Sequence, residues 1–293
     1  MQGGTLYMGQ AYQTPAGGLG PDDTDGNDAY GAGSDAPEQQ ATVAQAFHLD
    51  TFEVTLGRFR AFVASYDPAT LTAGAGANPS VPGSGWQAAW NSRIANDQAT
   101  LETDLASAAC NIDFTLSGPP QRSWTPTAGA SETLPMNCVT WYEAMAFCIW
   151  DGGRLPTEAE WEIAAVNGAE DDCQPWSGQP TSGCAGFMGC QLANVFNCGN
   201  VPLAVGTMMG TAVTGQYDMM GNVWELVLDQ YAPHGASACA GAACVALPGS
   251  GLFQAVVKGG SFSRDSDEAR GAHRDQTLSS GRSDFIGFRC AHD

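Results

Sequence analysis

Cysteine is the residue type with the most chemistry to offer in this chain of 293 residues, which contains ten of them. Thiolates bind metals or act as nucleophiles, and thiols pair as disulfides. Four are closely spaced: Cys173, Cys184, Cys190 and Cys198. They contain no C-x-x-C pair and no histidine lies beside them, so a zinc site is disfavoured. The even count favours disulfides formed in an oxidising compartment, with buried thiols as the alternative.

An acidic loop offers a second kind of chemistry. Asp23, Asp25 and Asn27 alternate as the first ligands of an EF-hand calcium loop do. The sixth and twelfth positions of that pattern require Gly and Glu, but Asp28 and Ser34 stand there. Because the surrounding sequence is rich in Gly, Asp, Ala and Pro, we interpret this segment as a solvated surface loop.

Charged side chains also gather near the C-terminus. They are Arg264, Asp265, Asp267, Glu268, Arg270, His273, Arg274 and Asp275. A loop of mixed charge is usually a solvated surface, but rigid scaffolds also present binding groups on loops, so both interpretations stay open. His234 has no visible ligand partner and is expected to be a surface histidine.

The composition limits the possible functions. Asp and Glu number 31 against 11 Lys and Arg, a formal net charge of −20. This acidity argues against sequence-independent nucleic-acid binding, which needs cations to neutralise phosphates. No apolar run approaches the roughly 18 residues of a membrane helix, and the start of the chain does not resemble a signal peptide. With 43% apolar residues, the chain is expected to fold around a sizeable core.

Short strands and few helices must position these residues. The segment 3–9 alternates like a strand that leaves a glycine turn, and 46–50 is strand-like. Thr55 is placed to cap a helix that carries Phe59 and Phe62 on one face.

Two capping boxes, Thr140–Glu143 and Thr157–Glu160, predict the starts of two further helices. Beyond residue 168 the chain is rich in loops, with short strand candidates near 201–206, 254–258 and 285–291. Few helices, short strands and long loops indicate the α+β class.

Residues 66–135 carry few clear signals and are expected to form a long decorated loop or an insertion. Trp86, Trp90 and Trp124 indicate that parts of this stretch still pack against the core. No internal repeat and no low-complexity linker divides the chain, so we expect one domain.

Five motifs in a fixed order carry a family resemblance. The most specific is Gly153-Arg-Leu-Pro-Thr-Glu-Ala-Glu-Trp-Glu162. The others are Gly3–Gly9, Phe52–Thr55, Tyr217–Glu225, and Lys258–Phe262 followed by Ile286–Ala291. Together they resemble the formylglycine-generating enzyme family, whose domains are also called sulfatase-modifying factor domains. The resemblance implies a single C-type-lectin-like α+β domain over 1–293, with 66–135 as its variable part.

The family's enzymes use oxygen and Cu(I), held by two cysteines, to oxidise a sulfatase cysteine to formylglycine. The resemblance places those cysteines just after the Gly-Gly-Ser element. Here the first position is Arg264, and the second is Glu268 or Ala269. No cysteine occurs between Cys244 and Cys290. Because Cu(I) selects soft thiolates, this chain is not expected to hold copper as the enzymes do.

Calcium is the cofactor that the resemblance does imply. One structural site would use Asp218, Glu225 and the carbonyl groups of Gly221 and Val223, a donor set that suits a hard cation. The alternative is a hydrogen-bonded turn around Trp224. A second and weaker site would use Asn194, Val195, Asn197 and Gly199, where Asn197 replaces the family's aspartate.

The resemblance also implies a disulfide between Cys148 and Cys290. Cys239 and Cys244 are close enough in sequence to bridge locally, and the other pairings stay open. Ser261 matches a serine of the enzyme site, but alone it is typical of a turn hydroxyl.

These observations favour an exported domain, secreted, periplasmic or on the cell surface, that presents a binding surface from its C-terminal segment to an unknown protein or small molecule. Scaffold and chemistry are separable. The variable proteins of diversity-generating retroelements resemble this scaffold, but their typical asparagines are absent from 259–293. The alternative is a copper-dependent oxidase built on other cysteines. An iron-dependent sulfoxide synthase is disfavoured because the chain has no H-x-x-x-H and only four histidines.

Overall fold

The computed structural model describes residues 1–8, 39–107, 110, 121–166, 189–233, 244–266 and 268–293. Its helices are α1 (Leu56–Ala64), α2 (Gln98–Ala106), α3 (Trp141–Trp150) and α4 (Glu158–Val166), with the short 3-10 helices η1 (Pro68–Thr70) and η2 (Ala88–Arg93). Its strands are β1 (Gly4–Met8), β2 (Gln39–Val43), β3 (His48–Leu49), β4 (Trp224–Gln230), β5 (Gln254–Lys258), β6 (Arg274–Leu278), β7 (Ile286–Phe288) and β8 (Ala291–His292). The predicted α+β class is confirmed.

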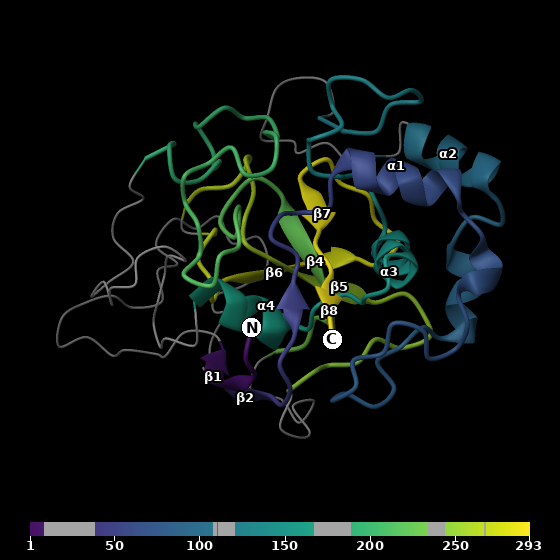
Figure 1. Ribbon diagram of the computed structural model, residues 1–293, viewed down its shortest axis with the longest axis horizontal. Helices are drawn as coiled ribbons and strands as arrows, with labels where there is room; N and C mark the ends of the chain where they lie inside the picture. The colour runs from purple at the N-terminus through teal and green to yellow at the C-terminus, as the bar shows by residue number, and fades with distance from the viewer. Residues whose placement is uncertain (9–38, 108–109, 111–120, 167–188, 234–243, 267) are drawn as a thin grey trace.

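A four-stranded sheet in the order β6-β5-β4-β7 crosses the middle of the molecule (Figure 1). Its neighbours are antiparallel except for β4 and β7, which run parallel. Two small sheets, β1-β2 and β3-β8, lie beside it, and the second brings the C-terminal strand next to an early one. The sheet therefore joins segments that are far apart in the sequence.

Alternate residues of β4 face two different cores. Leu226 and Leu228 pack in a cluster with α1 and α3, whereas Val227 packs in a second cluster with α4, β1 and β2. In Figure 1, α3 and α4 accordingly lie on opposite sides of the sheet. Because both faces are covered, this strand is buried along most of its length.

The predicted helix starts are confirmed. The Thr55 hydroxyl accepts a hydrogen bond from the Arg58 amide at the start of α1. Both bonds of the Thr140–Glu143 capping box are present at α3. At α4, the Thr157 amide donates to Glu160 over 2.9 Å, and the Glu160 amide donates to the Thr157 hydroxyl over 3.1 Å.

The strand predicted near 201–206 is wrong, because this segment is a loop. Pro202 has no amide to donate to a ladder. The neighbouring amides bond elsewhere: Leu203 donates to the Asn222 side chain and Val205 to the Thr133 carbonyl. The other two strand candidates correspond to β5 and to β7 with β8.

The stretch 66–135 contains η1, η2 and α2. Trp86, Trp90 and Trp124 are buried in it, as expected. The Trp90 ring lies 5.1 Å from the Trp141 ring of α3, and its Nε1 donates to the Gly249 carbonyl. This stretch therefore covers one end of the main core.

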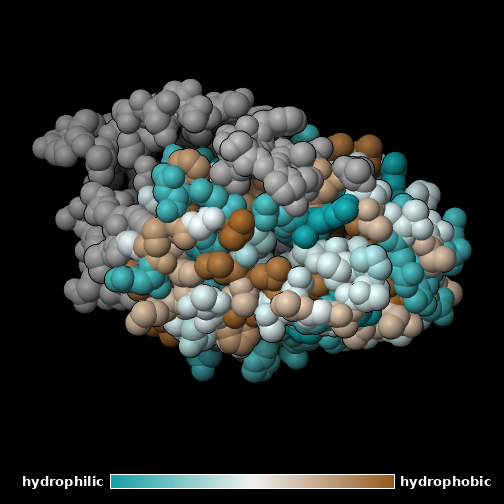
Figure 2. Space-filling view, turned by 90° about the horizontal axis from the view of Figure 1, so that it is seen from above, coloured by the Kyte–Doolittle hydropathy of each residue, from teal (hydrophilic) through white to brown (hydrophobic). Residues whose placement is uncertain are grey.

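Seen from above, the surface shows apolar patches broken up by hydrophilic side chains (Figure 2). Across the described ranges, no helix combines the length and the apolar character that a membrane crossing requires. The acidic loop around Asp23 and the residue His234 lie outside the described residues.

Candidate functional site

The loop after β5 begins at a turn that only glycine can form. Gly259 and Gly260 have φ values of +90° and +73°, in the left-handed region that favours glycine. A Cβ on Gly260 would lie 2.7 Å from the Cα of Ala269, which is too close. The loop therefore folds back on itself, with its residues 260 and 269 in contact.

Ser261 lies inside this turn. Its Oγ is 3.0 Å from the Oγ of Ser263, and both side chains are buried. The Phe262 amide donates to the Asn222 carbonyl, which fixes the turn to the start of β4. A serine in this position shapes the loop and does not face solvent.

Arg264 marks the point where the loop reaches the surface. Its guanidinium lies 5.4 Å from the centre of the Phe285 ring, and its Nε is 3.4 Å from a carboxylate oxygen of Glu268. Asp265 is exposed, and Glu268 and Arg270 are half-buried. We call Arg264, Asp265, Glu268 and Arg270 the C-terminal surface. Asp267 lies outside the described residues.

His273 and Arg274 do not belong to this surface, so their predicted surface position is wrong. Arg274 begins β6 and donates to Glu158 over 2.8 Å and to the Ala232 carbonyl over 2.7 Å. The His273 ring packs 5.8 Å from the Trp224 ring. Both are buried: Arg274 pairs with Lys258 of β5, and His273 directly precedes the strand.

A buried charge cluster supports the base of the loop. Lys258, at the end of β5, donates from Nζ to Glu162 over 2.9 Å and to the Ala272 carbonyl over 3.1 Å. Nearby, burial and the repulsion of Glu158 raise the pKa of Asp229 to about 7. The contact between Lys258 and Glu162 attaches the start of the loop to α4. The sequence did not predict this buried charge cluster.

The first predicted calcium set lies around a buried arginine. Both oxygens of Glu225 accept hydrogen bonds from the Arg289 guanidinium, at 2.6 and 2.7 Å, and one also accepts from Trp161. Asp218 accepts from the Gly206 amide. Arg289, a permanent cation, already engages both oxygens of Glu225, so calcium at this set would have to compete with it. Calcium at this set stays a prediction.

Glu53 joins this cluster and was missed by sequence reasoning, although it lies in the motif 52–55. It accepts from the Val223 amide and from the Asn222 side chain. Burial, followed by the repulsion of Asp218 and Glu225, raises its pKa well above the ordinary value. The predicted ligand Val223 thus donates to a network of buried carboxyl groups around one arginine, whereas the Gly221 amide donates to the Gly259 carbonyl.

The second predicted calcium set contains a buried side-chain oxygen that has no hydrogen-bond partner in the described part of the chain. Asn194 is fully buried, and its Oδ1 accepts no hydrogen bond from the described part of the chain. A Cβ on Gly199 would lie 3.8 Å from this oxygen, so the two ends of the loop face each other. Val195 is buried and Asn197 is exposed, with a φ of +66°. The Asn194 Oδ1 is a neutral oxygen of the kind that a hard cation binds, and calcium at this set stays a prediction.

Comparison with known proteins decides the family. The sequence profile of the sulfatase-modifying factor enzyme 1-like domain matches residues 1–293. The chain belongs to this family. The mouse inactive Cα-formylglycine-generating enzyme 2 is 27% identical over 93% of the chain and 82% of its own length. The Streptomyces coelicolor formylglycine-generating enzyme is 28% identical over the whole chain and 88% of its own length.

Structural comparison agrees on the fold. The structure of PvdO from Pseudomonas aeruginosa matches with a TM-score of 0.60 and 20% identity, covering the whole chain and 92% of PvdO. The relatives of this chain include one named a formylglycine-generating enzyme and one named an inactive formylglycine-generating enzyme.

The described cysteines of this family member are all disulfide-bonded. Cys148 pairs with Cys290, which confirms the pairing implied by the resemblance. Cys110 pairs with Cys138, and Cys190 pairs with Cys198. Cys244 is also disulfide-bonded, but its proposed partner Cys239 lies outside the described residues.

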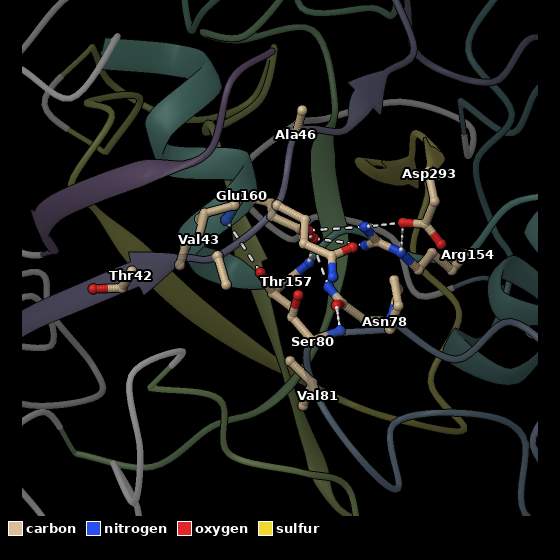
Figure 3. Close-up of a pocket in the computed structure, with 14 residues that line it drawn as sticks. Thr42, Val43, Ala46, Asn78, Ser80, Val81, Arg154, Thr157, Glu160 and Asp293 are labelled. Carbon is tan, nitrogen blue, oxygen red and sulfur yellow. Dashed lines mark hydrogen bonds and ion pairs between the residues drawn. The ribbon is translucent and has the colours of Figure 1, made fainter.

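A shallow pocket beside α4 is a structural feature rather than a ligand site. Figure 3 shows Arg154, Glu160 and Asp293, three of its lining residues, pointing toward one another. Arg154 binds both oxygens of Glu160, at 2.7 and 2.8 Å, and also Asp293. The interior space is about 10 Å³, enough for about one water molecule. A substrate therefore has no room here.

Proposed function

We propose that this member of the family is a non-catalytic binding or accessory protein that presents its C-terminal surface to a ligand. One observation carries the proposal. The positions where the enzymes hold copper are occupied here by Arg264 and by Glu268 or Ala269, and neither a guanidinium nor a carboxylate replaces a thiolate on Cu(I).

The surroundings of these positions support the proposal. Arg264 lies against the Phe285 ring, and Ala269 is buried against the loop that contains Val195. A side chain at 269 therefore faces the interior and not a substrate. A relative that is similar over most of the chain carries the name of an inactive enzyme.

Export is the second part of the proposal. Disulfides persist in oxidising compartments and are rare in the cytosol. Three pairs lie within the described residues. We infer a secreted, periplasmic or cell-surface protein from this redox chemistry.

A copper-dependent oxidase is the alternative, favoured by the similarity to an enzyme named formylglycine-generating over the whole chain. It would need a thiolate pair outside the described residues. The test is to incubate the unreduced protein with Cu(I), oxygen and a sulfatase peptide that contains the target cysteine. We expect no conversion to formylglycine by mass spectrometry, whereas copper-dependent turnover would overturn the proposal.

Ligand binding needs its own experiment. A glycan array and a peptide library would be screened with the wild-type protein and with Arg264→Ala. Arg93→Ala is the matched control, because Arg93 is an exposed arginine in η2. We expect Arg264→Ala to lose the recovered ligand and Arg93→Ala to keep it. Equal retention by both variants would exclude the C-terminal surface.

We also propose that calcium binds the loop formed by Asn194, Val195, Asn197 and Gly199. The unpartnered Asn194 oxygen supports this assignment. Calcium supplies structural cross-linking there and no redox chemistry. We expect a calcium-dependent rise in Tm that EDTA reverses, and an unchanged Tm would contradict the assignment.

A further inference from the structure

The loop 194–199 forms one structural unit with residues 261–266 and 268–269. The Phe196 amide donates to the Arg264 carbonyl over 2.8 Å. The Ala269 side chain packs in a small cluster with Ala193, Val195 and Met220. The C-terminal surface therefore rests directly on the loop that contains the candidate cation ligands.

Asn222 makes a second connection between the two segments. Its amide donates to the Asn194 carbonyl over 2.7 Å, and its own carbonyl accepts from the Phe262 amide over 2.9 Å. Its side-chain oxygen accepts from the Asn194 amide group over 3.1 Å. Because hydrogen bonds depend steeply on geometry, a shift of Asn194 is transmitted to the backbone at 262.

The orientation of the Asn194 side chain is fixed by its neighbours. Its Nδ2 donates both to the Val201 carbonyl and to the Asn222 Oδ1. A flipped amide would set oxygen against oxygen at both contacts. The Oδ1 is therefore held toward Gly199, in a buried position where an unmade hydrogen bond is costly.

We propose that occupation of this loop by calcium orders the C-terminal surface and so sets its competence to bind a ligand. The inference rests on the proposed function, since it concerns the regulation of that same surface. The donors are neutral oxygens, so the affinity is expected to be weak, with a Kd on the order of 10⁻⁴–10⁻³ M. Such a surface would respond to extracellular calcium levels.

The test is amide hydrogen exchange on the full, unreduced chain, with calcium alone as the probe after EDTA treatment. We expect calcium to slow exchange in 194–199 and in 261–269 with the same half-saturating concentration. Exchange in α1, which packs in the main hydrophobic cluster and not in the small cluster of Val195 and Ala269, is expected to stay unchanged. Magnesium at the same concentration serves as the selectivity control.

Three variants sharpen the experiment. Asn194→Ala removes the buried oxygen and is expected to abolish both responses. Asn197→Asp adds a charge at an exposed position, so the chain is expected to fold, and the half-saturating calcium concentration should fall by about tenfold or more. Asn96→Asp adds the same charge at an exposed position between η2 and α2 and should change nothing.

The outcomes separate the inference from the proposed function. Calcium protection of 194–199 without any change in 261–269 would refute the coupling and leave the binding role standing. No response in either the wild type or Asn197→Asp would also overturn the inference, while the Arg264→Ala screen would still decide the function. A response that survives in Asn194→Ala would show that calcium acts elsewhere.

Discussion

Removing the disulfides one at a time gives a graded prediction of stability. The Cys148–Cys290 bridge spans 142 residues and should contribute about 5 kcal/mol in the chain-entropy model. The Cys190–Cys198 bridge spans 8 residues and should contribute about 2.5 kcal/mol in the same model. Paired Cys→Ala variants are therefore expected to differ from each other by about 2.5 kcal/mol.

The burial of the cysteines increases this difference in the free energy of unfolding between the two variants. Cys148 and Cys290 are fully buried in the main core, so alanine at both positions also leaves space where two sulfurs packed. Cys190 is exposed and Cys198 is half-buried, so their replacement removes little packing. The Cys110–Cys138 pair, separated by 28 residues, should lie between the two.

Equilibrium unfolding in urea measures these losses, with far-UV circular dichroism as the probe and linear extrapolation to water. Because a denatured chain without the long cross-link expands, the m-value should rise more in the Cys148/Cys290 variant than in the Cys190/Cys198 variant. If the Cys190/Cys198 variant lost as much free energy of unfolding as the Cys148/Cys290 variant, the reasoning from loop length and burial would be refuted.

Three further predictions concern buried polar groups. Lys258→Met should lower the free energy of unfolding by about 3–5 kcal/mol in urea, because it leaves Glu162 without its cation in the core. Thr157→Ala should cost about 1 kcal/mol in the same assay through loss of the α4 cap. Because burial raises the pKa of Asp229 to about 7, the fold binds a proton more tightly than the unfolded chain. Its contribution to stability is therefore lost as pH rises from about 4 to 7, and Tm should fall over that window.

Each of these has a result that would contradict it. A Lys258→Met protein as stable as the wild type would show that Glu162 finds another partner or a proton. Thr157→Ser should keep the cap, so an equal loss in both variants would exclude capping as the cause. A Tm profile with the same slope in Asp229→Asn as in the wild type would remove Asp229 as the titrating group.

Helix starts were the part of this fold that the sequence predicted best, for a local reason. A capping box closes within four residues, so Thr140 and Glu143 contain all the information that their bonds need. Strand β5 was also found from its apolar run. The Cys148–Cys290 pairing, by contrast, came from family resemblance, because no local signal links residues 142 positions apart.

The strands and site residues that the sequence did not predict are those whose partners lie far away along the chain. β6 reads as a polar loop, since Arg274 is buried only because Glu158 reaches it from 116 positions away. β4 is covered on both faces and so lacks the alternation of a half-exposed strand. The same holds for the site: nothing local in the sequence shows that Arg289 engages Glu225 or that the Asn194 oxygen stays unpartnered.

Lys258 is the only lysine in the chain, and its side chain is fully buried. Reagents that modify ε-amines therefore find no target on the folded surface. The rate at which such a reagent reaches this residue would report how often the core between α4 and β5 opens. One ε-amine thus serves as a built-in probe of local unfolding, and no cross-link from this protein to a partner should form through a lysine of this chain while the fold is intact.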